Sequence, residues 1–171
     1  NTQPAIMTIG VSIFNVLTKE FGLNFKNTKF FAGHSLGEYT ALVCSGALTI
    51  ESAAYLLNER GKAMQSAVPE GEGGMLAVLG MSIEEVEKEI DKLPDGEICE
   101  IANDNSNMQV VVSGKKKSIE MFGKILKEKK KKGIILPVSA PFHCSLMKKA
   151  AESMKGKIES TNFKQPSLSV I

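Results

Sequence analysis

The chain has 171 residues, of which 43% are hydrophobic and 23% charged, and its formal net charge is +2. This balance predicts a globular cytoplasmic protein of one or two domains and gives no reason to expect nucleic acid as a partner. Cys44, Cys99 and Cys144 are odd in number and form no C-x-x-C pair, so reduced thiols are favoured over disulfides or a zinc site. No apolar run approaches the roughly 20 residues of a membrane span, and no membrane partner is expected.

The first part of the chain predicts a helix, a short strand and two more helices. Apolar residues recur at helical spacing over 4–20, and a buried strand follows at 28–32. An apolar helix is expected over 36–45, and Thr49 begins another that ends before Pro69. The sequence begins at the start of a predicted helix and ends in a strand-like run at 168–171 with no later segment to cover it, so we expect a fragment of a larger domain. We expect the protein to be a monomer.

The middle of the chain changes in pattern. The expected elements are a strand at 75–79, a helix at 82–93, strands at 97–103 and 109–113, a lysine-rich helix at 115–132 and a strand at 134–138. This β-α-β-β-α-β order is that of a ferredoxin-like unit. A further helix is expected at 146–160. We therefore predict an α/β fold with an α/β-hydrolase-like large subdomain around a parallel sheet, residues 1–72 and 139–171, and an inserted ferredoxin-like small subdomain, residues 73–138.

Ser35 lies in the motif Gly33-His34-Ser35-Leu36-Gly37. The spacing G-x-S-x-G between a strand and a helix is that of a nucleophile elbow, a sharp turn that exposes a serine hydroxyl. We interpret Ser35 as a candidate nucleophile; the alternative is a plain strand-turn-helix junction. The crowded positions on either side should accept little but glycine. The Leu36 N–H, at the start of the following helix, should point to where an oxyanion forms.

A serine nucleophile needs a base, and the chain has two histidines. His34 should point to the opposite side of the extended approach to the elbow, so it is favoured as a buried residue that braces the turn. His143, at a strand-to-helix junction, is then the base by elimination, unless it is a histidine without a catalytic role. Asp104, in an Asn-rich turn, and Glu38 do not stand out as its orienting acid, so we predict a Ser-His dyad.

Arg60 lies on the helix that follows the elbow helix, among apolar residues. This setting suits a bidentate grip on a substrate carboxylate, and the alternative is a solvated arginine or one paired with Glu59. Two lysine runs, 115–117 and 129–132, lie at the ends of the lysine-rich helix. They are interpreted as solvated charge, with an acidic partner surface as the alternative.

Three blocks of the chain together resemble the bacterial malonyl-CoA:acyl carrier protein transacylases. They are residues 33–39 (GHSLGEY), 60–65 (RGKAMQ) and 141–147 (PFHCSLM). The resemblance implies that Ser35 takes a malonyl group from malonyl-CoA, with His143 as base and the Leu36 N–H at the oxyanion. It implies that Arg60 holds the malonate carboxylate and that the acyl group passes to the phosphopantetheine thiol of acyl carrier protein in fatty acid synthesis. No metal or bound cofactor is implied.

The resemblance also implies finer features and leaves alternatives. Phe142 before the histidine favours malonyl over methylmalonyl, and His34 and Asn105 are candidate substrate contacts, although Asn107-Met108 replaces a Pro-Gly common in the family. The family extends further at both ends and carries a Gly-Gln-Gly loop that supplies a second oxyanion contact, so this chain alone should be nearly inactive. The alternatives are a polyketide synthase acyltransferase domain, the malonyl transferase of malonate decarboxylase, a generic serine hydrolase, or a non-enzymatic interaction module.

Overall fold

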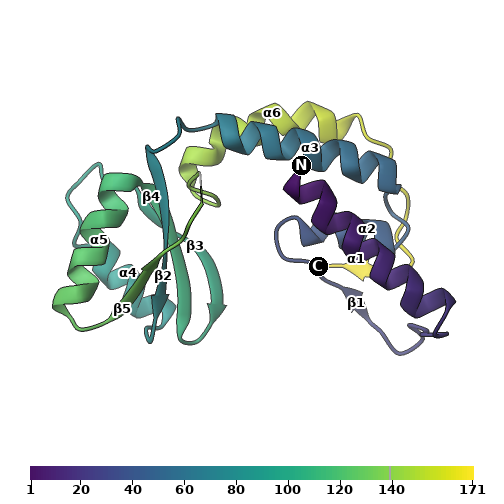
Figure 1. The fold of residues 1–171 in the computed structure, drawn as a ribbon, viewed down its shortest axis with the longest axis horizontal. Helices are drawn as coiled ribbons and strands as arrows, with labels where there is room; N and C mark the ends of the chain where they lie inside the picture. The colour runs from purple at the N-terminus through teal and green to yellow at the C-terminus, as the bar shows by residue number, and fades with distance from the viewer. Residues whose placement is uncertain (139) are drawn as a thin grey trace. The chain divides into compact units, whose positions relative to one another are not determined.

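In the computed structural model, which describes residues 1–138 and 140–171, the chain forms two compact units (Figure 1). The first unit consists of residues 1–62 and 153–171, and the second of residues 63–152. The chain passes from one unit to the other within two helices, α3 (Ile50–Ser66) and α6 (Lys148–Glu159).

The first unit combines helices with a very short parallel sheet. Its helix α1 (Thr2–Lys19) packs against α2 (Gly37–Cys44), and β1 (Phe30–Phe31) pairs with β6 (Ser169–Val170). The rings of Phe14, Phe25 and Phe31 have centroids 5.2–5.9 Å apart, which joins α1 to β1 through aromatic contacts. Thr49 begins α3 as expected, because its hydroxyl accepts a hydrogen bond from the Ser52 N–H at 3.2 Å.

The second unit is an antiparallel sheet covered by two helices on one face. The strand order is β3-β4-β2-β5, with β2 in contact with both β4 and β5. The strands are β2 (Gly73–Leu79), β3 (Cys99–Ser106), β4 (Gln109–Lys115) and β5 (Lys132–Ile135), and the helices are α4 (Ile83–Ile90) and α5 (Lys116–Glu128). Alternation of side chains gives the sheet two different faces.

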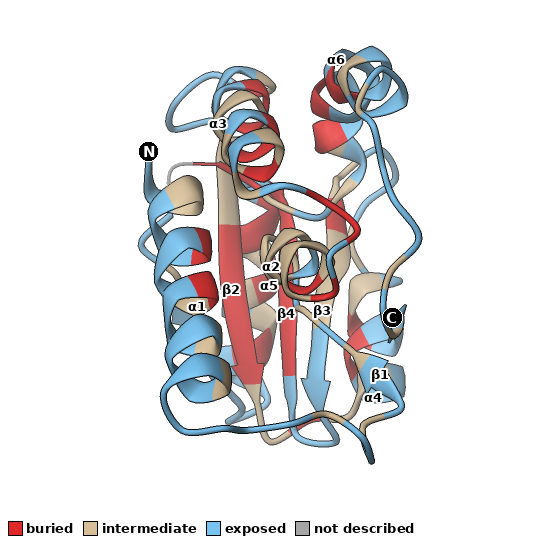
Figure 2. Ribbon diagram, turned by 90° about the vertical axis from the view of Figure 1, so that its right-hand side faces the viewer, coloured by how far each residue is buried: buried red, intermediate tan, exposed pale blue. Residues whose placement is uncertain are grey.

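The helix-covered face holds the main core. Leu76 and Val78 of β2 pack with Val86 of α4 and with Ile119 and Phe122 of α5, and all five are almost completely buried. Figure 2 shows how strongly burial is concentrated on β2 and β4. The opposite face carries a smaller cluster, whose buried members are Met75, Ala77 and Val111. Phe142, from the segment after β5, packs against this second cluster.

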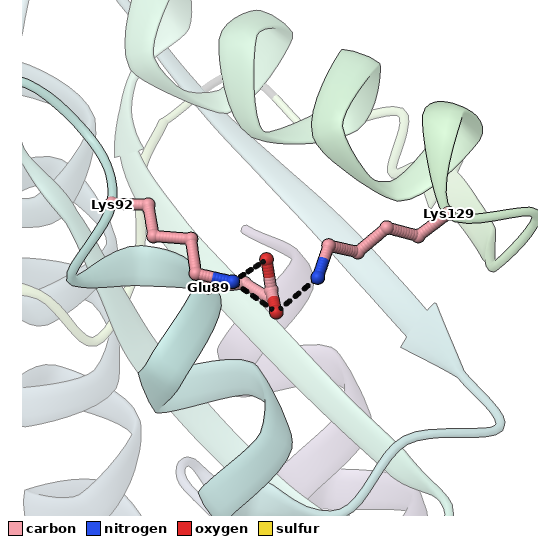
Figure 3. A network of polar contacts seen from close by, with 3 residues as sticks. All are labelled: Glu89, Lys92 and Lys129. Carbon is pink, nitrogen blue, oxygen red and sulfur yellow. Dashed lines mark hydrogen bonds and ion pairs between the residues drawn. The ribbon is translucent and has the colours of Figure 1, made fainter.

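Polar contacts fix the two helices at their ends. Ser82 and Glu85 form a reciprocal capping box at the start of α4, which stabilises the first turn. Near its other end, Glu89 forms ion pairs with Lys92 at 2.8 Å and with Lys129 at 2.7 Å (Figure 3). Because Lys129 follows the last residue of α5, this pair links the ends of the two helices.

Several expected boundaries differ from the structure. The last strand of the second unit is Lys132–Ile135 rather than 134–138, since Pro137 has no N–H to donate to a neighbouring strand. The lysine-rich helix ends at Glu128, so Lys132 belongs to β5. The expected Asn-rich turn at Asp104 is wrong: β3 continues to Ser106 through two register irregularities. The helix expected at 146–160 begins with a 3-10 turn, Ser145–Met147.

Candidate active site

Ser35 lies in the turn between β1 and α2, in a strained backbone conformation. Its φ is 57°, in the left-handed region that non-glycine residues rarely adopt. A Cβ atom on Gly33 would lie 2.0 Å from the backbone C and O of Gly37, so this position accepts only glycine. A Cβ on Gly37 meets nothing within 4 Å, and the expectation that both glycines are sterically required is therefore wrong at Gly37.

The backbone after Ser35 winds directly into α2. Gly37, Glu38 and Tyr39 donate their N–H groups to the carbonyls of His34, Ser35 and Leu36, with distances of 2.9, 3.2 and 3.1 Å. Leu36 occupies the N-cap position of α2 and already has helical φ and ψ. Its N–H is therefore one of the donors that the first turn of a helix leaves for an external acceptor, at the end where the helix dipole favours negative charge.

Arg60 of α3 brings its guanidinium to Ser35. The Nη2 group donates to Ser35 Oγ at 2.9 Å, and Nη1 donates to Oε1 of Gln3, at the start of α1. The alternative in which Arg60 pairs with Glu59 is wrong, because Glu59 instead forms ion pairs with Lys62 at 2.9 Å and Lys157 at 3.4 Å. Among the described residues Arg60 has no ion pair, and both of its hydrogen-bond acceptors are neutral side chains.

Burial and nearby charged groups shift the pKa of Arg60 in opposite directions. Burial lowers the pKa of the half-buried Arg60 guanidinium, while Tyr39 and Glu38 of α2 raise it. Burial likewise raises the pKa of Tyr39, with Arg60 opposing that shift. A partly desolvated guanidinium has lost some of its hydration, so it gains more from a carboxylate ligand than an exposed arginine does.

His143 belongs to the second unit and also has a left-handed backbone, with φ of 59°. It lies in the turn between β5 and the 3-10 helix, so the predicted strand-to-helix junction is confirmed. Pro141, two residues earlier, is fully buried, and a Cβ on Gly73 would meet its ring at 2.2 Å. His34, by contrast, is exposed, so the interpretation of this residue as a buried brace is wrong.

The remaining candidates are more peripheral. Asn105 is an exposed residue of β3, at one of the register irregularities. Over residues 1–138 and 140–171, no three His, Cys, Asp or Glu side chains gather closely enough to hold a metal ion. Within the same residues, no helix has both the length and the apolar character required to cross a membrane.

Sequence reasoning missed Gln3 as a partner of Arg60. The hydrogen bond joins residues 57 positions apart in the chain, and helical periodicity places Gln3 only at the polar start of α1. No local signal in the sequence identifies this partner: a Cβ on Gly61, the neighbour of Arg60, would lie 3.7 Å from the Gln3 amide, an ordinary van der Waals distance that does not require glycine.

A serine at a strained strand-to-helix turn, in contact with an arginine on a mixed α/β fold, is typical of enzymes that carry acyl groups on serine. A family model described as an acyl transferase domain matches residues 1–171, and the chain belongs to this family. The chain is 42% identical to the malonyl CoA-acyl carrier protein transacylase of Bacillus subtilis over 173 residues, which cover all of this chain and 53% of that protein.

Solved structures agree with this similarity. The acyl-carrier-protein-S-malonyltransferase of Bartonella henselae matches with a TM-score of 0.93 and 40% identity, over 100% of this chain and 55% of that one. A malonyl-transacylase solved in complex with a type II polyketide synthase acyl-carrier protein matches with a TM-score of 0.93 and 38% identity, over 99% of this chain and 54% of that one. The chain thus spans about half the length of the curated relatives it matches.

Proposed function

We propose that this protein transfers a malonyl group from malonyl-CoA to the phosphopantetheine thiol of acyl carrier protein, in fatty acid synthesis, through a malonyl ester on Ser35. The observation that carries the proposal is the 2.9 Å hydrogen bond from Arg60 to Ser35 Oγ. A cation in contact with the nucleophile is suited to an acyl group that ends in a carboxylate. The names of the relatives and the acyl transferase family match support the same reaction.

In the proposed first step, Ser35 Oγ attacks the thioester carbonyl of malonyl-CoA while His143 accepts its proton. The oxyanion of the tetrahedral intermediate accepts a hydrogen bond from the Leu36 N–H. The C–S bond then breaks, and the coenzyme A thiolate leaves with the proton from His143. In the second step the carrier thiol attacks the serine ester, and the Ser35 oxygen regains its proton through His143.

Arg60 determines which acyl group the site accepts. Its guanidinium is a planar fork whose two ends now contact neutral oxygens, those of Ser35 and Gln3. A malonyl carboxylate is the stronger acceptor, because it carries a negative charge and its two oxygens can accept both ends of the fork at once. An acetyl group offers no carboxylate and gains nothing from Arg60. Asn105 and His34 are proposed as weaker contacts to the substrate.

The finer description of the fold is also a proposal. The strand order β3-β4-β2-β5, with α4 and α5 on one face, supports a ferredoxin-like small subdomain. The parallel pair β1–β6 beside the elbow supports an α/β-hydrolase-like large subdomain. The division into residues 1–72 with 139–171 and 73–138 stays a prediction, and its boundary at residue 139 lies outside the described residues. We further propose a cytoplasmic monomer that uses no bound cofactor, since acyl transfer needs neither electrons nor a metal.

The test is to incubate the full-length protein with malonyl-CoA and measure its mass by intact and peptide mass spectrometry. We expect a malonyl adduct on the peptide that contains Ser35, removed when acyl carrier protein with its phosphopantetheine arm is added. Ser35→Ala should form no adduct. Hydrolysis without transfer to the carrier would indicate a serine hydrolase, and the absence of any adduct would leave only the fold assignment.

A further inference from the structure

The segment that carries His143 is attached to the sheet of the second unit at three points. Pro141 packs into the space that Gly73 leaves on β2, and Phe142 packs on the Met75, Ala77 and Val111 cluster. The third point is polar and follows the histidine: Glu100 of β3 accepts two hydrogen bonds from Ser145. The Ser145 N–H donates to Oε2 at 2.7 Å, and the Ser145 hydroxyl donates to Oε1.

The two hydrogen bonds place a carboxylate at the start of a helix. Ser145 is the first residue of the 3-10 turn Ser145–Met147, which continues directly into α6. The Cys144 side chain, at the N-cap position, provides no capping hydrogen bond. Glu100 therefore acts as the cap from another element, 45 positions away in the chain, where its charge also interacts favourably with the helix dipole.

The same carboxylate acts on the residue directly after His143. Burial raises the pKa of the Cys144 thiol, hydrogen bonds to the thiol oppose this shift, and the charge of Glu100 adds a smaller raising contribution. The thiol donates a hydrogen bond to the Pro141 carbonyl at 3.2 Å. This hydrogen bond closes the turn that contains Phe142 and His143. Glu100 thus fixes, through Ser145, the residue that directly follows this closed turn.

We propose that Glu100 is a positioning residue for His143: its carboxylate binds Ser145 and thereby fixes the strained turn that presents the imidazole. The inference rests on the proposed function for its kinetic readout. A left-handed histidine is held only where surrounding contacts compensate for its strain, which costs of the order of 1–2 kcal/mol. The two apolar contacts precede His143, whereas the two hydrogen bonds to Glu100 follow it.

The experiment compares three variants of the full-length protein. Glu100→Ala removes both acceptors, whereas Glu100→Gln retains one oxygen for the Ser145 N–H and can donate its amide to the Ser145 hydroxyl. The matched control is Glu85→Ala, which removes a glutamate that caps α4 in the same unit. For each variant kcat and KM for malonyl-CoA are measured, together with the imidazole nitrogen NMR signals of His143, assigned by comparison with His143→Gln.

For Glu100→Ala we expect kcat to fall about 10-fold with KM within about 2-fold, because charged hydrogen bonds contribute to this extent. Its His143 signals should broaden. Glu100→Gln should recover kcat to within about 3-fold and Glu85→Ala should retain it, both with sharp signals. The proposal is overturned if Glu100→Ala retains kcat and sharp signals, if Glu100→Gln loses as much as Glu100→Ala, or if Glu85→Ala loses as much. If the wild type transfers no malonyl group, the proposed function fails, and the NMR signals alone decide the role of Glu100.

Discussion

The two units hold their candidate catalytic residues in the same backbone conformation by different means. Ser35 in the first unit has φ of 57°, and His143 in the second has φ of 59°. The Ser35 turn is determined by main-chain crowding, since the backbone of Gly37 occupies the space where a Cβ of Gly33 would be. The His143 turn is held by contacts to the sheet that involve side chains, notably those of Pro141 and Ser145.

The difference predicts how each turn responds to substitution. Crowding between backbone atoms leaves no intermediate state, so the elbow either forms or does not. A turn held by several separate anchors loses them one at a time, and its function declines in steps. Positive φ by itself does not mark a functional residue: Lys130 has φ of 56° directly after the C-cap of α5, where such a conformation commonly ends a helix.

The largest effect is expected from Gly33→Ala. The backbone must move by more than an ångström to admit the new Cβ, and displacement of a reacting group by about 1 Å can cost about 100-fold in rate. We expect the rate of Ser35 acylation by malonyl-CoA, followed by quenched-flow mass spectrometry, to fall by more than about 100-fold.

Gly37→Ala is the matched control for this substitution, because its Cβ meets no atom and alanine favours the helix by about 1 kcal/mol. Acylation should stay within about 2-fold of wild type and the thermal midpoint should rise. Equal losses at the two glycines would contradict the steric account of the elbow.

Arg60→Ala, a substitution in the first unit, should have the next largest effect on activity. Loss of charge-assisted hydrogen bonds worth about 2–2.5 kcal/mol should lower kcat/KM for malonyl-CoA about 50-fold. Use of acetyl-CoA should rise instead, since acetyl has no carboxylate for Arg60 to bind. Competition kinetics with the two thioesters measures both. Arg60→Lys keeps the charge without the planar fork and should recover only part of the malonyl activity; an equal decrease for both thioesters would argue against the carboxylate grip.

The smallest effect is expected from Glu89→Gln, which tests whether the stability of the second unit can be lowered without disturbing the turn that holds His143. Glu89→Gln breaks the ion pairs with Lys92 and Lys129 (Figure 3) and should lower the free energy of unfolding by about 1 kcal/mol with kcat unchanged. Urea denaturation measures the loss. Glu87→Gln, an exposed residue of the same helix, is the control and should change little.

The effect of Glu89 should depend on pH. Hydrogen bonds from Lys129 and Lys92 hold the pKa of the Glu89 carboxyl below its ordinary value of 4.5. A carboxyl whose pKa is lowered on folding stabilises the fold fully above its unfolded pKa, and this contribution disappears as the pH falls through the folded pKa. Wild type and Glu89→Gln should therefore differ at pH 7 and converge in acid below pH 4.5. A difference that persists there would show that the ion pairs are not its cause.

Much of the fold could be predicted because it is encoded locally. The helix at Thr49, the α4 capping box at Ser82 and the buried alternation of β2 and β4 all follow from short patterns. The continuation of β3 through Asp104 could not be read in this way. Polar residues there suggested a turn, and the strand persists because β4 provides hydrogen-bond partners across an irregular register.

The candidate site divides in the same way. The elbow at Ser35 follows from five adjacent residues, so its strained turn and the need for Gly33 were predictable. The partners of Arg60 and of Ser145 were not, since Gln3 and Glu100 are distant in sequence and become neighbours only through packing. A polar residue with no periodic or motif context gives no local signal of the contact it makes.

The parallel pair β1–β6 also has a consequence for the order in which the protein is made. Phe30 pairs with Ser169, and the Phe31 carbonyl accepts a hydrogen bond from the Ile171 N–H at 2.9 Å. During translation β1, which leads into the elbow, therefore cannot pair with β6 until the residues between them and β6 itself have been synthesised. The sheet of the second unit has all four strands by residue 135, so it can close first. Ser35 is then synthesised well before β6, and its strand can pair only after that later segment has been made.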